Sequence, residues 1–365
     1  MTDERLKLPF FIRATVFFVG LIALVAILYI ARSIIVPLVF AIIIAIVLHP
    51  VVNFLVKIRI NRIVAISITI LATFLIIAAF GALMISQISR FSETLPDLID
   101  NFTKALNQAI SWVSGNFEIK PQKIHAWISK TQGELINSSG AAIGQTLVLL
   151  GNGLVILFLL PVYIFLILFY HPILIEFIQR LSSDNDKSKV SEIVSKIKTV
   201  IQRYLVGLVI EAGIMATLNT TALLILGIQY AFLLGLISAI VNVIPYIGGL
   251  VGVALPMMVA LATKPSGWHA VYVLIAFYII QLFDNNFIVP KIVASKVKIN
   301  ALFSIIVVFV GNAIWGIPGM FLSIPLLAVL KLIFDNIESL KPWGFLLGDT
   351  MPNILKIKTI FKKGK

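Results

Sequence analysis

Long apolar runs separated by short polar links dominate the chain. About 20 consecutive apolar residues are needed to cross the hydrocarbon core of a bilayer as a helix. Six runs are predicted as full spans: Phe10–Ala31, Ile34–Leu48, Ile63–Ile85, Leu147–Phe169, Tyr204–Leu226 and Val271–Phe283. The pattern therefore predicts an all-α polytopic membrane protein.

Pro and Gly interrupt two further apolar stretches, 230–262 and 302–334. As one helix the first would measure roughly 50 Å at 1.5 Å per residue, which overshoots a core of about 30 Å. Backbone groups freed inside a bilayer are tolerated only where protein or a water-filled cavity satisfies them. We expect two hairpins that enter from opposite faces, about eight membrane segments in all. A single crossing, or two full crossings, per stretch is the alternative.

The breaks themselves supply the first candidate solute-binding residues. Interrupted membrane helices are a sequence-level indicator of a transport site. Each break follows an amide side chain that can bond either the opened backbone or a solute. These candidates are Asn242, Pro245, Gly248, Asn312 and Pro318.

Two acids within or beside apolar runs are the other candidates. Glu211 is the lone acid of the fifth run, and a carboxylate at membrane depth is by default a functional candidate. The alternative is a Glu near the membrane interface, paired with Arg203 or Lys198. Asp284 and Asn285 follow Gln281 by one turn at the end of the last run. They form either a helix terminus and turn or a site for Na⁺ or hydroxyl groups.

The polar segments organise the chain into five parts. In order these are 1–85 with three spans, 86–146, 147–203, 204–340 with the two broken stretches, and the basic tail 341–365. Part 86–146 has a heptad-like apolar seam and nearly balanced charge, which predicts an extracytoplasmic amphipathic helical segment or a subunit contact. Basic residues cluster in the other links, and the positive-inside rule then places both termini in the cytoplasm.

Composition supports membrane insertion and argues against several functions. Hydrophobic residues make up 60% of the 365 positions, charged residues 12%, and the mean hydropathy is +1.06. The excess of 29 Lys and Arg over 16 Asp and Glu is explained by cytoplasmic loops, without nucleic acid. The chain has no Cys, no phosphate-binding Gly loop and no His-x-x-x-His pair. We expect a protein that is not an enzyme and needs no cofactor or metal.

The motifs around the two broken stretches resemble the AI-2E family of transporters. The similarity is carried by Gly207, Gly227, Asn242-x-x-Pro245-Tyr246-x-Gly248, Gly252, Pro256, Gln281-x-x-Asp284-Asn285, Pro290-Lys291-Ile292, Gly311, Gly316, Gly319 and Pro325. The chain departs from the family pattern at Gly249, where many relatives have Pro, and at Asn300-Ala301, where His-Pro or a similar pair is expected.

The resemblance implies a bacterial cytoplasmic-membrane permease that exports a small polar solute such as a signalling molecule. It also implies a homo-oligomer, with a pentamer as one candidate, in contact with membrane lipids. Some relatives are linked to autoinducer-2 and others to Na⁺/H⁺ exchange, so H⁺ or Na⁺ coupling is expected. A Na⁺/H⁺ antiporter, a passive oligomeric channel and a non-transporting membrane scaffold are the competing functions.

Overall fold

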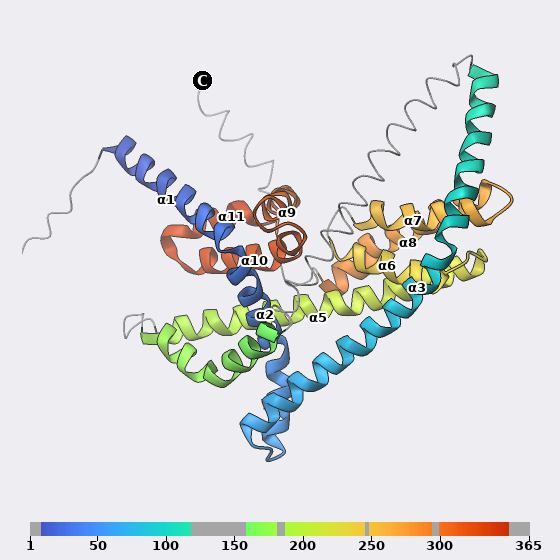
Figure 1. Ribbon diagram of the computed structural model, residues 1–365. Helices are drawn as coiled ribbons and strands as arrows, with labels where there is room; N and C mark the ends of the chain where they lie inside the picture. The colour runs from blue at the N-terminus through green and yellow to red at the C-terminus, as the bar shows by residue number, and fades with distance from the viewer. Residues whose placement is uncertain (1–8, 118–157, 181–186, 245–247, 294–298, 350–365) are drawn as a thin grey trace, which may run out of the picture.

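The computed structural model describes residues 9–117, 158–180, 187–244, 248–293 and 299–349, which form helices and no β-strand (Figure 1). Within this part of the chain, seven helices are long and apolar enough to cross a membrane. They are Phe10–Ile30, Arg32–Lys57, Arg62–Thr94, Phe158–Arg180, Ser188–Ile225, Trp268–Val293 and Ile317–Asn336. The predicted class, an all-α polytopic membrane protein, is confirmed.

The first half of the chain forms a V of long helices (Figure 1). Helix α1 (Phe10–Ile30) leads into α2 (Arg32–Lys57), and α3 (Arg62–Phe117) returns from the α2–α3 turn. The helix Phe158–Arg180 packs against both α2 and α3. Their common core consists of Ala41, Ala45, Val52, Ala65, Ile66, Ile70, Ile164 and Leu168.

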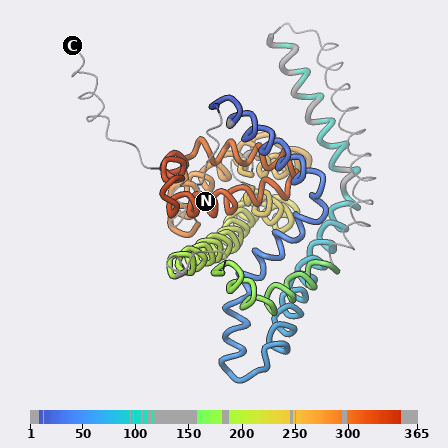
Figure 2. The backbone as a smooth tube through the Cα atoms, turned by 90° about the vertical axis from the view of Figure 1, so that its left-hand side faces the viewer, coloured from blue at the N-terminus to red at the C-terminus, as the bar shows by residue number. Residues whose placement is uncertain are grey.

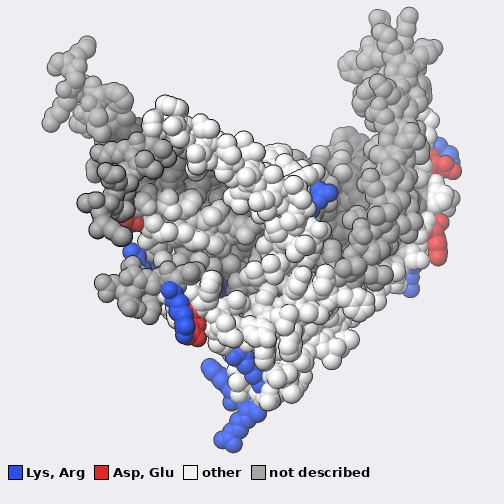
Figure 3. Space-filling view, turned by 60° about the vertical axis from the view of Figure 1, so that its left-hand side comes forward, with Lys and Arg blue, Asp and Glu red and all other residues white. Residues whose placement is uncertain are grey.

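Apolar side chains also cover much of the outer surface. None of the apolar window of α1 is buried, and Figure 3 shows a largely uncharged surface with Lys and Arg gathered at its lower end. Such a surface is unfavourable in water but matches lipid. The exposed apolar faces of α1, α2 and α3 are therefore consistent with membrane insertion.

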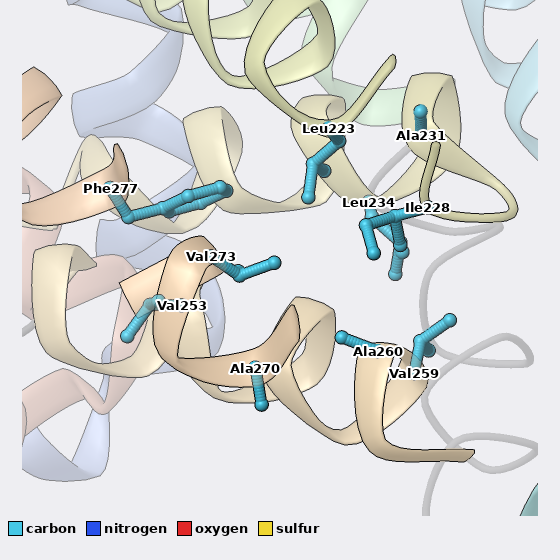
Figure 4. Packing of buried hydrophobic residues seen from close by; sticks show 10 residues of the cluster. All are labelled: Leu223, Ile228, Ala231, Leu234, Val253, Val259, Ala260, Ala270, Val273 and Phe277. Carbon is cyan, nitrogen blue, oxygen red and sulfur yellow. The ribbon is translucent and has the colours of Figure 1, made fainter. Parts of the chain in front are cut away.

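The second half begins with the 39-residue helix α5 (Lys187–Ile225). Short helix α6 (Ala231–Asn242) packs along it, and α7 (Gly248–Thr263) packs against α6 and against α8 (Trp268–Phe283), which continues into the π-helix η2 (Asp284–Val293). Figure 4 shows the apolar cluster that joins them. Its buried members are Leu223, Ile228, Ala231, Leu234, Val253, Val259, Ala260, Ala270, Val273 and Phe277.

The second broken stretch forms α9 (Ala301–Trp315) and α10 (Ile317–Asn336), which pack against each other. Gly316 joins them with φ of 67°, a left-handed conformation that favours glycine. Pro318 lies in the first turn of α10, where its missing N–H has no intrahelical partner to lose. The break is thus a tight turn between two helices.

Both ends of this pair are tied to other parts of the fold. Near the turn, Trp315 Nε1 donates to the Leu28 carbonyl at 2.9 Å, and α1 lies beside α9 (Figure 2). At the other end, the short helix α11 (Lys341–Leu347) follows α10 and a 3₁₀ turn, Glu338–Leu340. The Asn300 N–H donates to the Leu347 carbonyl at 2.9 Å, which ties the start of α9 to α11.

Helix boundaries differ from the predicted segment boundaries in three places. The predicted span Ile63–Ile85 and the polar segment after it form one helix that continues to Phe117, and α5 likewise joins a charged segment to a span. Helix α10 has 20 residues, enough to cross the membrane alone, whereas α9 has 15. The second broken stretch is therefore a pair of helices of unequal length. Residues 147–157 of the fourth predicted span lie outside the described residues.

Candidate functional site

A cavity of about 670 Å³ lies between α5, the α6–α7 pair, α8, η2 and the α9–α10 pair. Most of its wall is apolar, and its polar groups converge from five helical elements, α5, α6, α8, η2 and α9. The polar lining residues are Tyr204, Glu211, Asn242, Tyr278, Gln281, Asp284, Asn285 and Ser304. An apolar cavity with a few convergent polar groups is the usual form of a small-molecule site.

Asp284 is the most deeply buried polar residue of this cavity, with 1% of its surface exposed. Its Oδ2 accepts hydrogen bonds from Asn242 Nδ2 at 3.1 Å and from Gln281 Nε2 at 3.3 Å. Its Oδ1 has no hydrogen-bond partner among the residues described. A buried acceptor without a partner is unfavourable, so this oxygen is available to a proton, a cation or a solute donor.

Local helix geometry places Asp284 at the cavity. It is the first residue of the π-helix that continues α8. Such wider turns occur mostly as short insertions at functional sites. Gln281, one turn before, donates to both Asp284 Oδ2 and Asn285 Oδ1, the latter at 3.4 Å, because side chains three and four residues apart lie on the same face of a helix.

Glu211 approaches the same cavity from α5 and is 6% exposed. Its carboxyl group is close enough to Asp284 for their charges to interact. The lining residues include no Lys or Arg, and among the described residues no basic side chain lies within 4 Å of either carboxylate. The alternative prediction, a pairing with Arg203 or Lys198, is therefore wrong. Arg203 is exposed, Lys198 Nζ lies 2.9 Å from His49 Nδ1, and neither forms an ion pair with Glu211 among the described residues.

Close backbone contacts hold α5 against η2. A Cβ on Gly207 would lie 2.7 Å from the Ile292 carbonyl oxygen, and a backbone atom cannot move aside easily. Only glycine therefore permits this approach. Because Gly207 precedes Glu211 by one turn of α5, this contact brings the two acids together.

The α6–α7 pair supplies the amide of the site. Asn242 is the last residue of α6, and Gly248 begins α7 against the backbone of Asn242. Farther from the turn, Ser238 Oγ donates to the Gly252 carbonyl at 2.5 Å. These contacts fix the pair so that Asn242 points to Asp284.

A second glycine of α7 makes room for Gln281. A Cβ on Gly249 would lie 2.7 Å from Gln281 Oε1 and 2.8 Å from its Cδ. Gly249, where this chain departs from the family pattern, therefore lies directly beside Gln281 and the polar groups of the cavity.

Five of the nine sequence-predicted residues line the cavity: Glu211, Asn242, Gln281, Asp284 and Asn285. Gly248 supports the turn beside them, and Pro245 lies outside the described residues. Asn312 and Pro318 are exposed at the α9–α10 turn and are not among the lining residues. The α9–α10 pair reaches the cavity instead through its other end, at Ala301, Ser304 and Ile324.

Three polar lining residues were missed by the sequence reasoning: Tyr204, Tyr278 and Ser304. Tyr204 is 5% exposed and lies seven residues before Glu211, so helical periodicity alone places both on one face of α5. Ser304 is 7% exposed, and its hydroxyl donates to the Asn300 carbonyl at 3.1 Å. A single Ser in an apolar helix carries no sequence signal that would have identified it.

The fold and the cavity define a multi-pass membrane protein with a polar site between its spans. The sequence pattern of the AI-2E family of transporters matches residues 18–339. The chain is 25% identical over 333 residues to AI-2 transport protein TqsA of Escherichia coli (strain K12), covering 87% of this chain and 90% of TqsA. YueF of Bacillus subtilis (strain 168), which carries a provisional transport-protein name, is 24% identical over 268 residues, 72% of each chain.

The chain belongs to the AI-2E family and is a membrane transporter. The family assignment confirms the resemblance seen in the motifs.

Proposed function

We propose that the chain is a secondary transporter that moves a small polar solute through the Glu211–Asp284 cavity, with H⁺ or Na⁺ as the coupling ion. The observation that supports this most strongly is the pair of buried carboxylates surrounded by amides, with Asp284 Oδ1 unpartnered among the described residues. Intramembrane acids commonly mark ion and proton pathways.

The charge of the cavity favours a cation or a proton. Two neighbouring carboxylates in a low-dielectric site repel each other, and a buried charge without a counter-ion is strongly unfavourable. Protonating one acid, or binding one Na⁺ between them, relieves both effects. Asn242 and Gln281 donate to Asp284, so their amide oxygens remain free to coordinate a cation or accept from a solute.

The broken stretches would give this site access to both sides of the membrane. We propose that α6 and α7 are a re-entrant hairpin, because they measure roughly 18 and 24 Å at 1.5 Å per residue, short of a core of about 30 Å. Rocking of such a hairpin against α5 would expose Asp284 alternately to either face. The α9–α10 pair would close the opposite side.

Location, assembly and solute follow from the same proposal. The basic α2–α3 turn and the basic tail support cytoplasmic termini in a bacterial inner membrane. The exposed apolar faces of α1–α3 offer surface for lipid or for further copies of the chain in a homo-oligomer. TqsA is named an AI-2 transport protein, so AI-2 is the first solute to test, and export is the direction we propose.

A flux assay in proteoliposomes tests the proposal. Purified protein is reconstituted, and uptake and release of AI-2 and of other small polar solutes are measured with and without Na⁺ and pH gradients. We expect saturable flux that Glu211→Gln and Asp284→Asn each reduce by at least tenfold. Flux at the wild-type rate in both variants would exclude the carboxylates from the mechanism.

Matched controls make the result specific. Glu192→Gln changes an exposed acid on the same helix as Glu211, and Asp100→Asn changes an exposed acid on α3. Both control variants should transport normally, and all four should elute as monodisperse protein.

The same assay distinguishes the other functions. A Na⁺/H⁺ antiporter is also favoured by two acids in a cavity whose lining includes no Lys or Arg. It would exchange H⁺ for Na⁺ across the membrane with no other solute present. A passive channel would show flux that does not saturate. A membrane scaffold would show no flux under any gradient.

A further inference from the structure

Four basic side chains from four helices meet away from the transport cavity. His49 lies on α2, Arg62 at the start of α3, His171 on the Phe158–Arg180 helix and Lys198 on α5. The rings of His49 and His171 are 4.5 Å apart, and Lys198 Nζ lies 2.9 Å from His49 Nδ1. Arg62 Nη2 donates to the Leu168 carbonyl, one turn before His171, at 2.8 Å.

This basic cluster contains no acid to balance it. Lys198 and Arg62 are the charged groups that act on both histidines, and His171 also acts on His49. Among the described residues no carboxylate lies within 4 Å of Arg62 or Lys198, and the nearest acids along these helices are engaged elsewhere: Glu176 with Arg180, and Glu192 with Lys196. Like charges held together in a partly buried site need a counter-charge.

The hydrogen bonds leave the cluster rich in donors. Lys198 Nζ and Asn53 Nδ2 both point to His49 Nδ1, which assigns the ring proton to the other nitrogen, Nε2. Several donors are then not used by these hydrogen bonds: His49 Nε2–H, the remaining N–H groups of Lys198 and the remaining N–H groups of Arg62. A group with several negatively charged oxygens satisfies such a set best.

The position of the cluster indicates where that group comes from. It adjoins the α2–α3 turn, where Lys and Arg gather in Figure 3. Large apolar side chains beside it point outward: Val51, Phe54 and Tyr170 are 48%, 63% and 46% exposed. A basic pocket between membrane helices with an apolar flank is the arrangement that binds a lipid headgroup while the acyl chains lie on the protein surface.

We propose that the basic cluster of His49, Arg62, His171 and Lys198 is a phosphate-binding site that holds α2, α3 and the Phe158–Arg180 helix against α5. A phosphodiester of an anionic lipid and a soluble phosphate share this chemistry. The site is independent of the transport cavity, since none of its four residues lines that cavity.

Native mass spectrometry and thermal unfolding of the purified chain test the site. The protein is titrated in detergent with phosphatidylglycerol, cardiolipin, phosphatidylcholine and, separately, inorganic phosphate. We expect wild-type protein to retain the anionic lipids over phosphatidylcholine and to unfold several degrees higher with them. Arg62→Gln/Lys198→Gln should weaken that binding by at least about tenfold, as expected on losing charge-assisted hydrogen bonds.

Neighbouring basic residues outside the cluster provide matched controls. The control variants Lys57→Gln, at the end of α2, and Lys196→Gln, on α5, are made singly and together. Together they remove the same two positive charges as the double variant, and all of them should bind lipid as wild type does. A shift with inorganic phosphate alone, lost in the double variant, would assign the site to soluble phosphate. Equal retention of phosphatidylcholine by wild type, or equal weakening by the control variants, would overturn the proposal, and the wild-type measurement decides it even if the double variant does not fold.

Discussion

Replacing Gly249 with Ala tests whether Gln281 must hold its observed position. The added Cβ would lie 2.7 Å from Gln281 Oε1, whereas ordinary contact begins at 3.4 Å. The difference, 3.4 − 2.7, requires the amide to move by about 0.7 Å. The Gln281–Asp284 hydrogen bond, already 3.3 Å long, would lengthen beyond hydrogen-bonding range.

The magnitude follows from the kind of bond that is lost. A hydrogen bond to a charged group contributes about 1.5–3 kcal/mol, and the length of this one favours the lower end. Losing this donor destabilises the ionised Asp284 carboxylate and favours its protonation, so we expect about a tenfold decrease in the H⁺ concentration that half-saturates transport. Because the obstructed atoms are the end of a flexible side chain, the melting temperature should stay within a few degrees of wild type.

A double-mutant cycle makes the reasoning refutable. If Gly249→Ala acts through Gln281, then Gln281→Ala should have a similar effect, and the double variant should be no worse than either. Gly213→Ala on α5, where a Cβ meets nothing within 4 Å, is the matched control and should transport normally. Additive effects in the double variant would contradict the mechanism.

Two further substitutions test the contacts that assemble the site. Gly207→Ala would press a Cβ against the Ile292 carbonyl, so we expect a loss of roughly 1–3 kcal/mol of stability, read as a lower melting temperature; an unchanged melting temperature would show that α5 and η2 do not need this approach. Ser238→Ala removes the donor to the Gly252 carbonyl and should lower the free energy of unfolding by about 1 kcal/mol. Ser238→Thr, which keeps a hydroxyl donor, should retain more of that stability, and equal losses in both variants would argue against the hydrogen bond.

The membrane character of the chain could be predicted from the sequence, but the ends of its helices could not. Apolar run length identified the spans, because crossing a bilayer demands a minimum number of apolar residues. The apolar run length placed the end of the third span at Ile85 and the start of the fifth at Tyr204. In the structure, α3 continues past Ile85 to Phe117, and α5 begins before Tyr204, at Lys187. A change in polarity marks where a helix leaves lipid, and without Gly or Pro at the junction nothing stops the helix itself.

The two broken stretches illustrate what Pro and Gly do and do not determine. The described residues show a helix interrupted at each break: α6 ends at Asn242 before α7 begins at Gly248, and Gly316 separates α9 from α10. Pro325, however, lies buried inside α10 without ending it. The role of Asn312 as a solute ligand was inferred by analogy with Asn242, and the structure places it on the exposed side of the turn instead.

The assembly of the site depends on contacts between residues far apart in sequence. Glu211 and Asp284 could each be identified as an unusual acid, because a carboxylate in an apolar run is rare. Their proximity could not be predicted, since it depends on the contact of Gly207 with Ile292 and on the π-helix that begins at Asp284. The motifs singled out Gly207 and Ile292, but one sequence read alone does not show that these two residues touch or that a π-helix begins at Asp284.

Blocking the cavity chemically tests most directly whether solute passes through it. The chain contains no Cys, so Ser304→Cys places a single thiol in the cavity wall. Modification of this variant by a charged, water-soluble thiol reagent should abolish flux in proteoliposomes, and saturating solute should slow the modification, while wild-type flux is unaffected. Complete labelling, verified by mass, that leaves the flux of Ser304→Cys unchanged would contradict the account.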